Sequence, residues 1–363
     1  MQELGDLVTF IIPAYNVENY IGECLDSLLN QTRTRHKIIV VNDGSTDKTG
    51  DIAKAYAERY PSIIRLLNQE NKGLGAARNA ALPFVNTPYV TYLDSDDIEE
   101  CHFVERLENE LSRHDESVDI VFTLPWCFDS VTNVVYEWRD RYLMESLFYP
   151  YGGREDVISH EMTKNDPRWM KMYLLEASCC RCVFNIAFLK RIGYFFPEGT
   201  KWEDVWPHFC SIHYAQRCIG LKSTGFFYRV NNATQITSAN GASRLDVVSV
   251  FSDILRKAMQ MKWQEQEIAY IIEMYRDFAA WSINVTNTDY INGLLRKVHD
   301  SFRSIPKRYL KNYCAICERS KKELLYIHLL RSPFYGVLAD YRVRNICKLL
   351  YGKLKRIKHL VKR

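Results

Sequence analysis

The chain has 363 residues, of which 47% are hydrophobic and 25% charged, and its formal net charge is +4. This composition predicts a globular protein with one large α/β domain and a smaller addition. Its apolar runs are shorter than the ~18 to 20 residues that a membrane-spanning helix needs, and no secretory signal pattern opens the chain. Eleven cysteines, an odd number, favour reduced thiols in the cytoplasm over a disulfide framework.

Strand and helix patterns alternate through the first 124 residues. Apolar runs predict strands at 8–13, 37–42, 63–68, 89–93 and 118–124, and helical spacing predicts helices at 21–29, 47–59, 73–84 and 103–113. Such alternation predicts a mostly parallel sheet with helices on both faces. The segment 125–200 is rich in aromatic residues and hard to interpret, and long helical patterns dominate from about residue 245 to the end.

Acidic turns follow two of the predicted strands. The sequence NDGS at 42–45 follows the second strand, and DSDD at 94–97 follows the fourth. Ligands of such sheets bind beyond the carboxyl ends of the strands, so we expect these acids to converge on one rim. Like charges repel, and the string 93–99 leaves little to bury, so it is a poor structural element by itself. A solvated acidic turn is one interpretation, and Mg²⁺ or Mn²⁺ held with a nucleotide diphosphate is the other.

Five segments together resemble the signature blocks of glycosyltransferase family 2. Each motif is weak alone, but their order and spacing over about residues 7–238 make the combination specific. The last of them resembles the Glu-Asp block of bacterial capsule and surface-polysaccharide members. The segments are VTFIIPAYN at 8–16, VNDGSTD at 41–47, NKGLGAARN at 71–79, YLDSDD at 92–97, and RIGYFFPEG at 191–199 leading into WED at 202–204.

The resemblance implies the GT-A fold, a Rossmann-like α/β sheet, over residues 1–240. Its donor half would cover about 1–124 and its acceptor half about 125–240, with a helical extension over 241–363. It implies a UDP-sugar donor and a divalent cation, Mn²⁺ or Mg²⁺. A carboxylate can accept the imide proton of uracil, and an arginine fork matches a phosphate. The implied donor-site residues are Pro13, Tyr15 and Asp43 at the uracil, Asn71 and Arg78 at the nucleotide and diphosphate, and Asp94 at the ribose.

The resemblance also implies residues for the metal and the chemistry. Asp96 would bind the cation directly, with Asp94 helping to set the site. Asp204 would be the catalytic base of a single inverting displacement, with Glu203 in reserve. Singly, each residue has an ordinary explanation: for the last two it is an exposed acidic pair at a helix start, where acids are favoured anyway. For Tyr15, Arg78 and Asp43 the explanations are core packing, a surface ion pair and a turn.

Two further sequence features bear on the substrate. Residues 228–237 resemble the family's loop over the donor diphosphate, where Arg229 is the candidate contact, although Gln235 stands where serine is usual. Processive synthases of the family carry Gln-x-x-Arg-Trp, whereas here Asn165 precedes the Arg-Trp pair at 168–169. Transfer of a single sugar per encounter is therefore expected.

The C-terminus is strongly basic. Residues 331–363 hold ten Lys or Arg and one acid, Asp340, and the pattern over 340–363 is typical of an amphipathic interfacial helix. We therefore expect a cytoplasmic protein held peripherally on the anionic inner face of the plasma membrane. Packing of this helix on its own protein or in a homodimer is the alternative, and nucleic acid is the least favoured partner.

The cysteine spacing raises one more possibility, a zinc site. Cys179 with Cys182 and Cys314 with Cys317 form two Cys-x-x-Cys pairs, which together would supply four thiolates. The pairs are far apart in the sequence and lie in apolar contexts, where buried free thiols are ordinary.

The sequence thus predicts a metal-dependent, inverting, non-processive hexosyl- or N-acetylhexosaminyltransferase. It would move one sugar from a UDP-sugar to a hydroxyl of a bacterial surface glycan or a lipid-linked oligosaccharide. One alternative is a nucleotidyltransferase that makes sugar nucleotides, but residues 13–20 lack the glycine-rich loop with a catalytic Lys or Arg that it normally carries. The other is an inactive membrane-associated scaffold.

Overall fold

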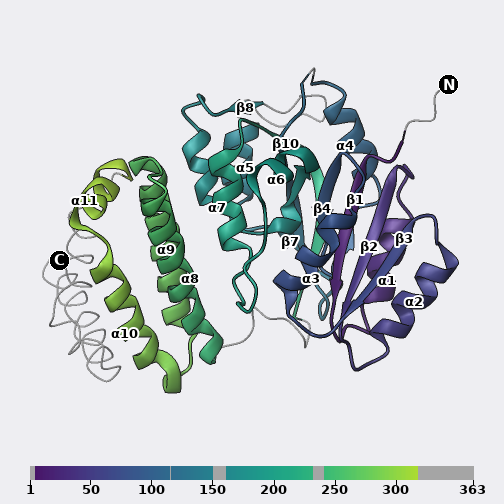
Figure 1. The fold of residues 1–363 in the computed structure, drawn as a ribbon, viewed down its shortest axis with the longest axis horizontal. Helices are drawn as coiled ribbons and strands as arrows, with labels where there is room; N and C mark the ends of the chain where they lie inside the picture. Colours follow the sequence, from purple (N-terminus) through teal and green to yellow (C-terminus); the bar gives the residue numbers. More distant parts are fainter. Residues whose placement is uncertain (1–4, 115, 150–160, 232–240, 318–363) are drawn as a thin grey trace, which may run out of the picture. The chain divides into compact units, whose positions relative to one another are not determined.

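The computed structural model describes residues 5–114, 116–149, 161–231 and 241–317 (Figure 1). The chain divides into two compact units, Met1–Ile236 and Thr237–Arg363. The sequence placed this boundary at residue 240. The predicted basic helix over 340–363 lies outside the described residues. Within the described part, no helix has the length and apolar character that crossing a bilayer requires.

The donor half of the first unit is a parallel sheet with the strand order β3-β2-β1-β4. Every residue of β1 is buried, as expected for a strand covered by helices on both faces. Figure 1 shows α3 on the near side of these strands and α1 on the far side. The elements are β1 Val8–Ala14, α1 Ile21–Leu29, β2 His36–Asp43, α2 Thr49–Arg59, β3 Ile64–Gln69, α3 Leu74–Ala81 and β4 Tyr89–Tyr92.

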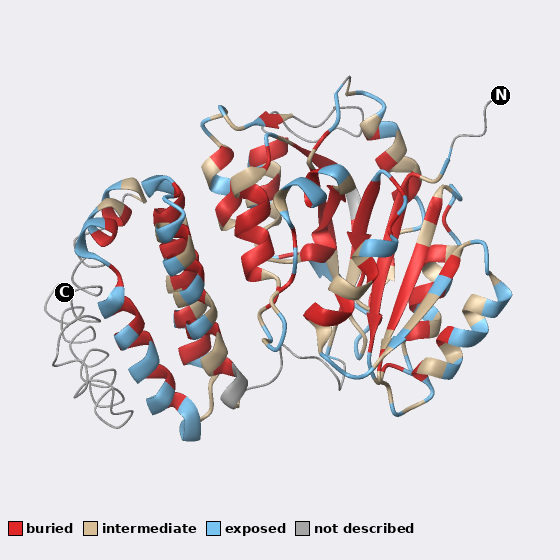
Figure 2. Ribbon diagram, in the orientation of Figure 1, coloured by how far each residue is buried: buried red, intermediate tan, exposed pale blue. Residues whose placement is uncertain are grey.

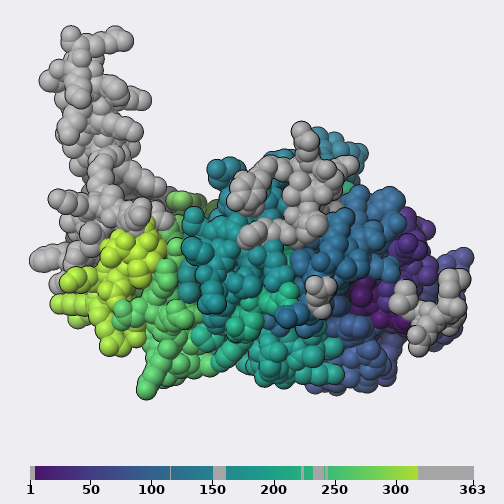
Figure 3. Space-filling view, turned by 90° about the horizontal axis from the view of Figure 1, so that it is seen from above, coloured from purple at the N-terminus to yellow at the C-terminus, as the bar shows by residue number. Residues whose placement is uncertain are grey.

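The rest of the first unit continues the same sheet in the order β4-β9-β6-β10-β5. β9 pairs antiparallel with both β4 and β6, and β6 pairs parallel with β10. In Figure 3 the purple and blue donor half and the teal acceptor half form one continuous surface. The elements are β5 Ile98–Glu99, α4 Phe103–Leu111, β6 Ile120–Asp129, β7 Val135–Glu137, α5 Arg141–Phe148, β8 Met162–Thr163, β9 Cys182–Asn185, α6 Ile186–Ile192, α7 Val205–Tyr214 and β10 Arg217–Val230.

Two predicted elements differ in detail from the structure. The acidic string at 93–99 is not a poor structural element, because Ile98–Glu99 forms β5 against β10 and Asp97 is only 1% exposed. The helix predicted over 73–84 leaves the α conformation after Ala81 and ends as the 3-10 turn Leu82–Phe84. Pro83 explains this end, since it has no backbone N–H to donate.

The described part of the second unit, residues 241–317, is helical. Its core includes a stack of aromatic rings in which Tyr275 lies between Phe251 and Phe302, with ring centroids 5.1 and 4.8 Å apart. Figure 2 shows buried residues along the inner side of these helices and throughout the strands of the first unit. The helices are α8 Asp246–Gln260, α9 Glu265–Val285, α10 Thr288–Ser304 and α11 Lys307–Ile316.

Candidate active site

Asp43, the last residue of β2, joins the carboxyl ends of two strands to the start of α3. Its Oδ1 accepts hydrogen bonds from Gln69 Nε2 at 2.7 Å and from the Lys72 backbone N at 2.9 Å. Its Oδ2 accepts one from the Gly73 backbone N at 2.8 Å. A carboxylate oxygen has two lone pairs, so Oδ2 can accept one more hydrogen bond, such as that of a uracil imide.

The other predicted base-binding residues surround this turn. Gly44 has φ +70°, and a Cβ there would lie 2.6 Å from the backbone N of Asn71. Because glycine has no Cβ, Asn71 can lie this close to the end of β2. Pro13 pairs with Val41 in the adjoining strand, so it lies at the same rim. The side chain of Tyr15 is 46% exposed, which excludes core packing and leaves its ring available to a ligand.

Arg78 is the centre of the site, because its buried guanidinium holds three carboxylates. Nη2 donates to Asp94 Oδ1 at 2.8 Å, and Nη1 donates to Glu203 Oε1 at 2.9 Å and to Asp204 Oδ1 at 2.6 Å. The Arg78 side chain is 1% exposed, and it also lies 5.2 Å from the centre of the Phe196 ring. The predicted metal-side acid and the predicted base are therefore joined through one side chain.

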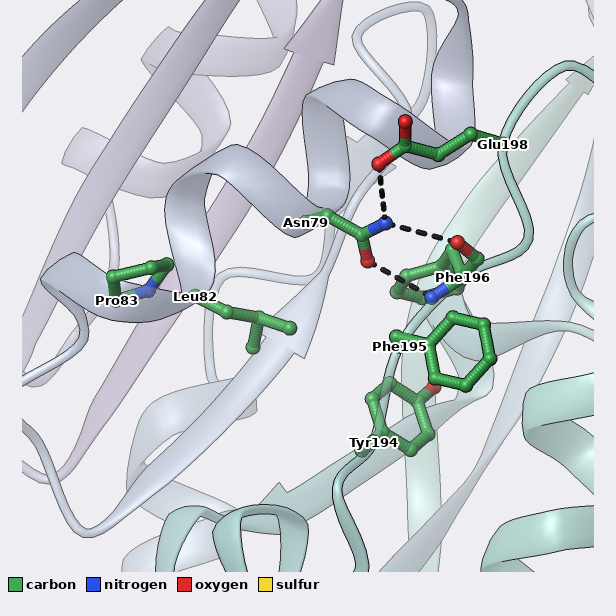
Figure 4. A pocket seen from close by; sticks show the side chains of 7 residues that line it. All are labelled: Asn79, Leu82, Pro83, Tyr194, Phe195, Phe196 and Glu198. Atoms are coloured by element: carbon green, nitrogen blue, oxygen red, sulfur yellow. Dashed lines mark hydrogen bonds between the residues drawn. The ribbon is translucent and has the colours of Figure 1, made fainter.

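The loop that carries Glu203 and Asp204 is fixed against α3. The Asn79 side chain donates to Phe196 O at 2.9 Å and accepts from Phe196 N at 2.8 Å (Figure 4). Asn79 also donates to Glu198 Oε1, at 3.1 Å. A surface pocket of about 550 Å³ opens beside these contacts, and its lining includes none of the predicted site residues. Asn79 thus holds the loop in place from outside the predicted site.

Burial and crowding change the acidity of the two carboxyl groups that directly precede α7. Burial first, and then the Asp204 charge, raises the pKa of Glu203 to about 8. Burial also raises the pKa of Asp204, against the lowering effect of the Arg78 guanidinium and of hydrogen bonds from Cys179. The side chains of Glu203 and Asp204 are 6% and 22% exposed, so they are not the exposed acidic pair of the alternative interpretation.

Arg229, at the end of β10, holds the acidic turn from the other side. Its Nε donates to Asp96 O at 2.7 Å, its backbone N donates to Asp97 Oδ1 at 2.8 Å, and its Nη2 donates to Glu23 Oε2 at 2.6 Å. The guanidinium also lies 5.2 Å from the centres of two rings, Tyr20 and Phe128. The remainder of the predicted diphosphate loop, at 232–237, lies outside the described residues.

Asp97 is a further candidate site residue, which the sequence reasoning did not single out although it belongs to the same acidic string. Its Oδ2 is buried and has no hydrogen-bond partner. Burial, and then the charges of Asp96 and Asp94, raises its pKa well above the ordinary value. Only its position in the acidic turn between β4 and β5, beside the two predicted ligands, could have pointed to it.

The residues of the acidic turn fit a hard divalent cation. Asp94 keeps 32% of its side chain exposed and Asp96 is partly exposed, so both can offer carboxylate oxygens to Mn²⁺ or Mg²⁺. Among the described residues, three potential metal ligands gather only at 100–102, and not within this turn. A cation at 94–96 would therefore complete its shell with diphosphate oxygens and water. Neither Cys-x-x-Cys pair belongs to a group of three ligands within the described chain.

Comparison with known proteins agrees with the predicted family. Residues 9–176 match the model of Glycosyl transferase family 2. The glycosyltransferase GlyA of Streptococcus pneumoniae is 44% identical over 117 residues, which are 32% of this chain and 17% of GlyA. The uncharacterized glycosyltransferase EpsJ of Bacillus subtilis is 43% identical over 115 residues, 32% of this chain and 33% of EpsJ. The matched part thus spans a third or less of these relatives.

Solved structures resemble the fold over almost the whole chain. TarS 1-349 of S. aureus, in complex with UDP-GlcNAc, has a TM-score of 0.69 at 19% identity and covers 94% of this chain and 92% of its own. The mannosyltransferase PcManGT of Pyrobaculum calidifontis, in complex with GDP-Man and Mn²⁺, has a TM-score of 0.51 at 17% identity, with 94% and 88% covered. Residues 9–176 therefore carry a glycosyltransferase family 2 domain, and the fold of the chain is of the GT-A type.

Proposed function

We propose that this protein is an inverting, non-processive glycosyltransferase that moves one hexosyl or N-acetylhexosaminyl group from a UDP-sugar. The acceptor is a hydroxyl of a bacterial surface glycan or a lipid-linked oligosaccharide. The observation that carries the proposal is the Arg78 network, which joins Asp94 at the end of β4 to Asp204 at the start of α7. UDP-GlcNAc in TarS supports a uridine donor.

The donor half supplies the nucleotide site in this proposal. Tyr15 stacks on the uracil, Asp43 accepts the imide proton, and Pro13 and Asn71 complete the nucleotide contacts at the same rim. Asp94 contacts the ribose. Arg229 lies beside the acidic turn and is the proposed contact to the diphosphate. These roles agree with the exposed ring of Tyr15 and with the free lone pair on Asp43 Oδ2.

Asp96, helped by Asp94, would hold Mn²⁺ or Mg²⁺, which supplies positive charge opposite the departing diphosphate. Asp204 accepts the proton of the acceptor hydroxyl as the acceptor oxygen attacks the anomeric carbon. Its raised pKa suits a base that works near neutral pH. Burial and the charge of Asp204 raise the pKa of Glu203 and so favour its protonated form, which leaves Glu203 as the reserve candidate for the base.

The test is UDP release from a panel of UDP-sugars with Mn²⁺ and with Mg²⁺. The wild type should turn over at least one donor, and Asp96→Ala should lose turnover by about 100-fold or more, the usual range for charge stabilisation in an active site. Asp253→Ala, an exposed aspartate of α8, is the matched control and should retain activity. Formation of UTP from pyrophosphate would indicate the nucleotidyltransferase instead, and no turnover in any arm would indicate a scaffold.

The basic segment 340–363 is proposed to bind anionic lipid on the inner face of the plasma membrane. The sequence pattern supports this, since each basic residue near an anionic surface contributes roughly 1 kcal/mol. Vesicle flotation of the full chain and of a chain ending at residue 339 tests the proposal. Equal binding by both chains would refute it, and the molar mass of the two chains in solution would show whether the segment forms a homodimer.

A further inference from the structure

One guanidinium serves both sides of the proposed active site. Arg78 uses Nη2 for Asp94 and Nη1 for both Glu203 and Asp204, at 2.6 to 2.9 Å. Its side chain is 1% exposed and so has no contact with bulk water. The three acids therefore share a single positive charge. A change in the charge around any one of them alters the strength of the interaction between Arg78 and the other two.

Resting on the proposed function, we propose that Arg78 couples occupancy of the donor site to the state of the base Asp204. When a cation and a nucleoside diphosphate bind at the acidic turn, Asp94 gains a second positive partner. The ion pair between Asp94 and Arg78 then becomes weaker. The guanidinium then interacts more strongly with Asp204 and Glu203, which fixes the base in position. Arg78 is in this way a positioning residue, which acts through two others.

The coupling has a definite sign in the reverse direction. If Asp204 becomes neutral, Asp94 receives a larger share of the Arg78 charge and is less available to a cation. Coupling free energies are reciprocal. The binding free energy that the donor loses when Asp204 is neutral therefore equals the free energy by which a bound donor stabilises ionised Asp204. A fork with two separate Nη atoms is needed for this, because a lysine ammonium is a point charge that cannot span the two sides.

The test is calorimetric titration of UDP in saturating Mn²⁺, which needs neither an acceptor nor turnover. Asp204→Asn should weaken UDP binding about 5-fold or more, the lower end of typical coupling. In an Arg78→Lys background the same substitution should change affinity by less than about 2-fold, because the charge remains but the fork is lost. The matched control is Asp140→Asn, which alters another buried arginine pair, Arg181 with Asp140, and should leave UDP affinity unchanged.

Glu23→Gln keeps the test decisive if Arg78→Lys does not fold. This change removes a negative charge near the acidic turn, at the Arg229 side, without touching Arg78. Coupling through Arg78 predicts no weakening by Glu23→Gln, whereas weakening equal to that of Asp204→Asn would mean a through-space charge effect and overturn the inference. The inference is also overturned if Asp204→Asn leaves UDP affinity unchanged. It is equally overturned if Asp204→Asn weakens UDP binding as much in the Arg78→Lys background as in the wild type, or if Asp140→Asn weakens UDP binding as much as Asp204→Asn does. Only a wild type that fails to bind UDP would sink the proposed function as well.

Discussion

Gly75 marks a close approach between α3 and the loop that carries the proposed base. A Cβ at this position would lie 2.6 Å from the backbone oxygen of Pro197, 3.3 Å from Phe196 Cβ and 3.4 Å from Glu203 Cβ. A loop carbonyl cannot swing aside as the end of a flexible side chain can. Gly75→Ala must therefore separate α3 from this loop, and Arg78 lies one turn further along the same helix.

Two opposing effects set the size of the change. Alanine is favoured over glycine within a helix by about 1 kcal/mol. Forcing a methyl group into a filled contact costs about 1–3 kcal/mol, so the substitution should be neutral to about 2 kcal/mol destabilising. In a unit of this size, 1 kcal/mol lowers the melting temperature by about 2–4 °C. A shift of about 1 Å between Arg78 and Asp204 can lower turnover by about 100-fold.

The assay is thermal unfolding followed by UDP release, with Gly22→Ala as the matched control. Gly22 lies in α1, and a Cβ there would meet only the Tyr56 hydroxyl, at an ordinary 3.7 Å. The control should therefore keep its activity and melt at an equal or slightly higher temperature. A Gly75→Ala protein that is more stable than the wild type and fully active would refute the close packing of α3 on this loop.

Three more predictions follow from the same site. Folding raises the pKa of Glu203 from 4.5 to about 8, so the protonated form of Glu203 stabilises the folded protein. This stabilisation is complete below pH 4.5 and is lost as the pH rises through 8. The melting temperature should therefore fall across this pH range in the wild type, and fall less in Glu203→Gln. Asp97→Asn keeps the acceptor for the Arg229 backbone N and should melt close to the wild type, whereas Asp97→Ala should melt lower. Asp96→Asn should fold normally and lose Mn²⁺-dependent UDP binding in calorimetry.

The donor half was predictable because its strands and helices are long enough to show a period. A run such as 8–14 is buried along its whole length, and α1 repeats its apolar residues at helical spacing. The shortest strands gave no such signal, because β5 and β8 have two residues each and β7 has three. The antiparallel insertion of β9 between β4 and β6 depends on contacts distant in sequence, which no local pattern encodes.

The identity of the site residues was easier to predict than their contacts. The motifs selected Arg78, Asp94 and Asp204 for separate tasks, with the arginine on the diphosphate. The structure instead places the Arg78 guanidinium against the two acids just before α7, 125 and 126 positions further along the chain. Sequence spacing carries no information about such a contact, and the burial of Arg78 follows only from the packing of α3 against the loop before α7. The diphosphate contact of Arg78 stays a prediction.

The exposure of the three acids around Arg78 orders their proposed roles. If all three were ionised, one guanidinium would leave two uncompensated negative charges in a buried site, which is costly. Glu203, the least exposed at 6%, removes one of them by keeping its proton. Asp204 is 22% exposed and Asp94 32%, so the acids that must meet an acceptor hydroxyl and a bound donor are those with access to solvent. The single negative charge that remains is the one that an incoming divalent cation can neutralise.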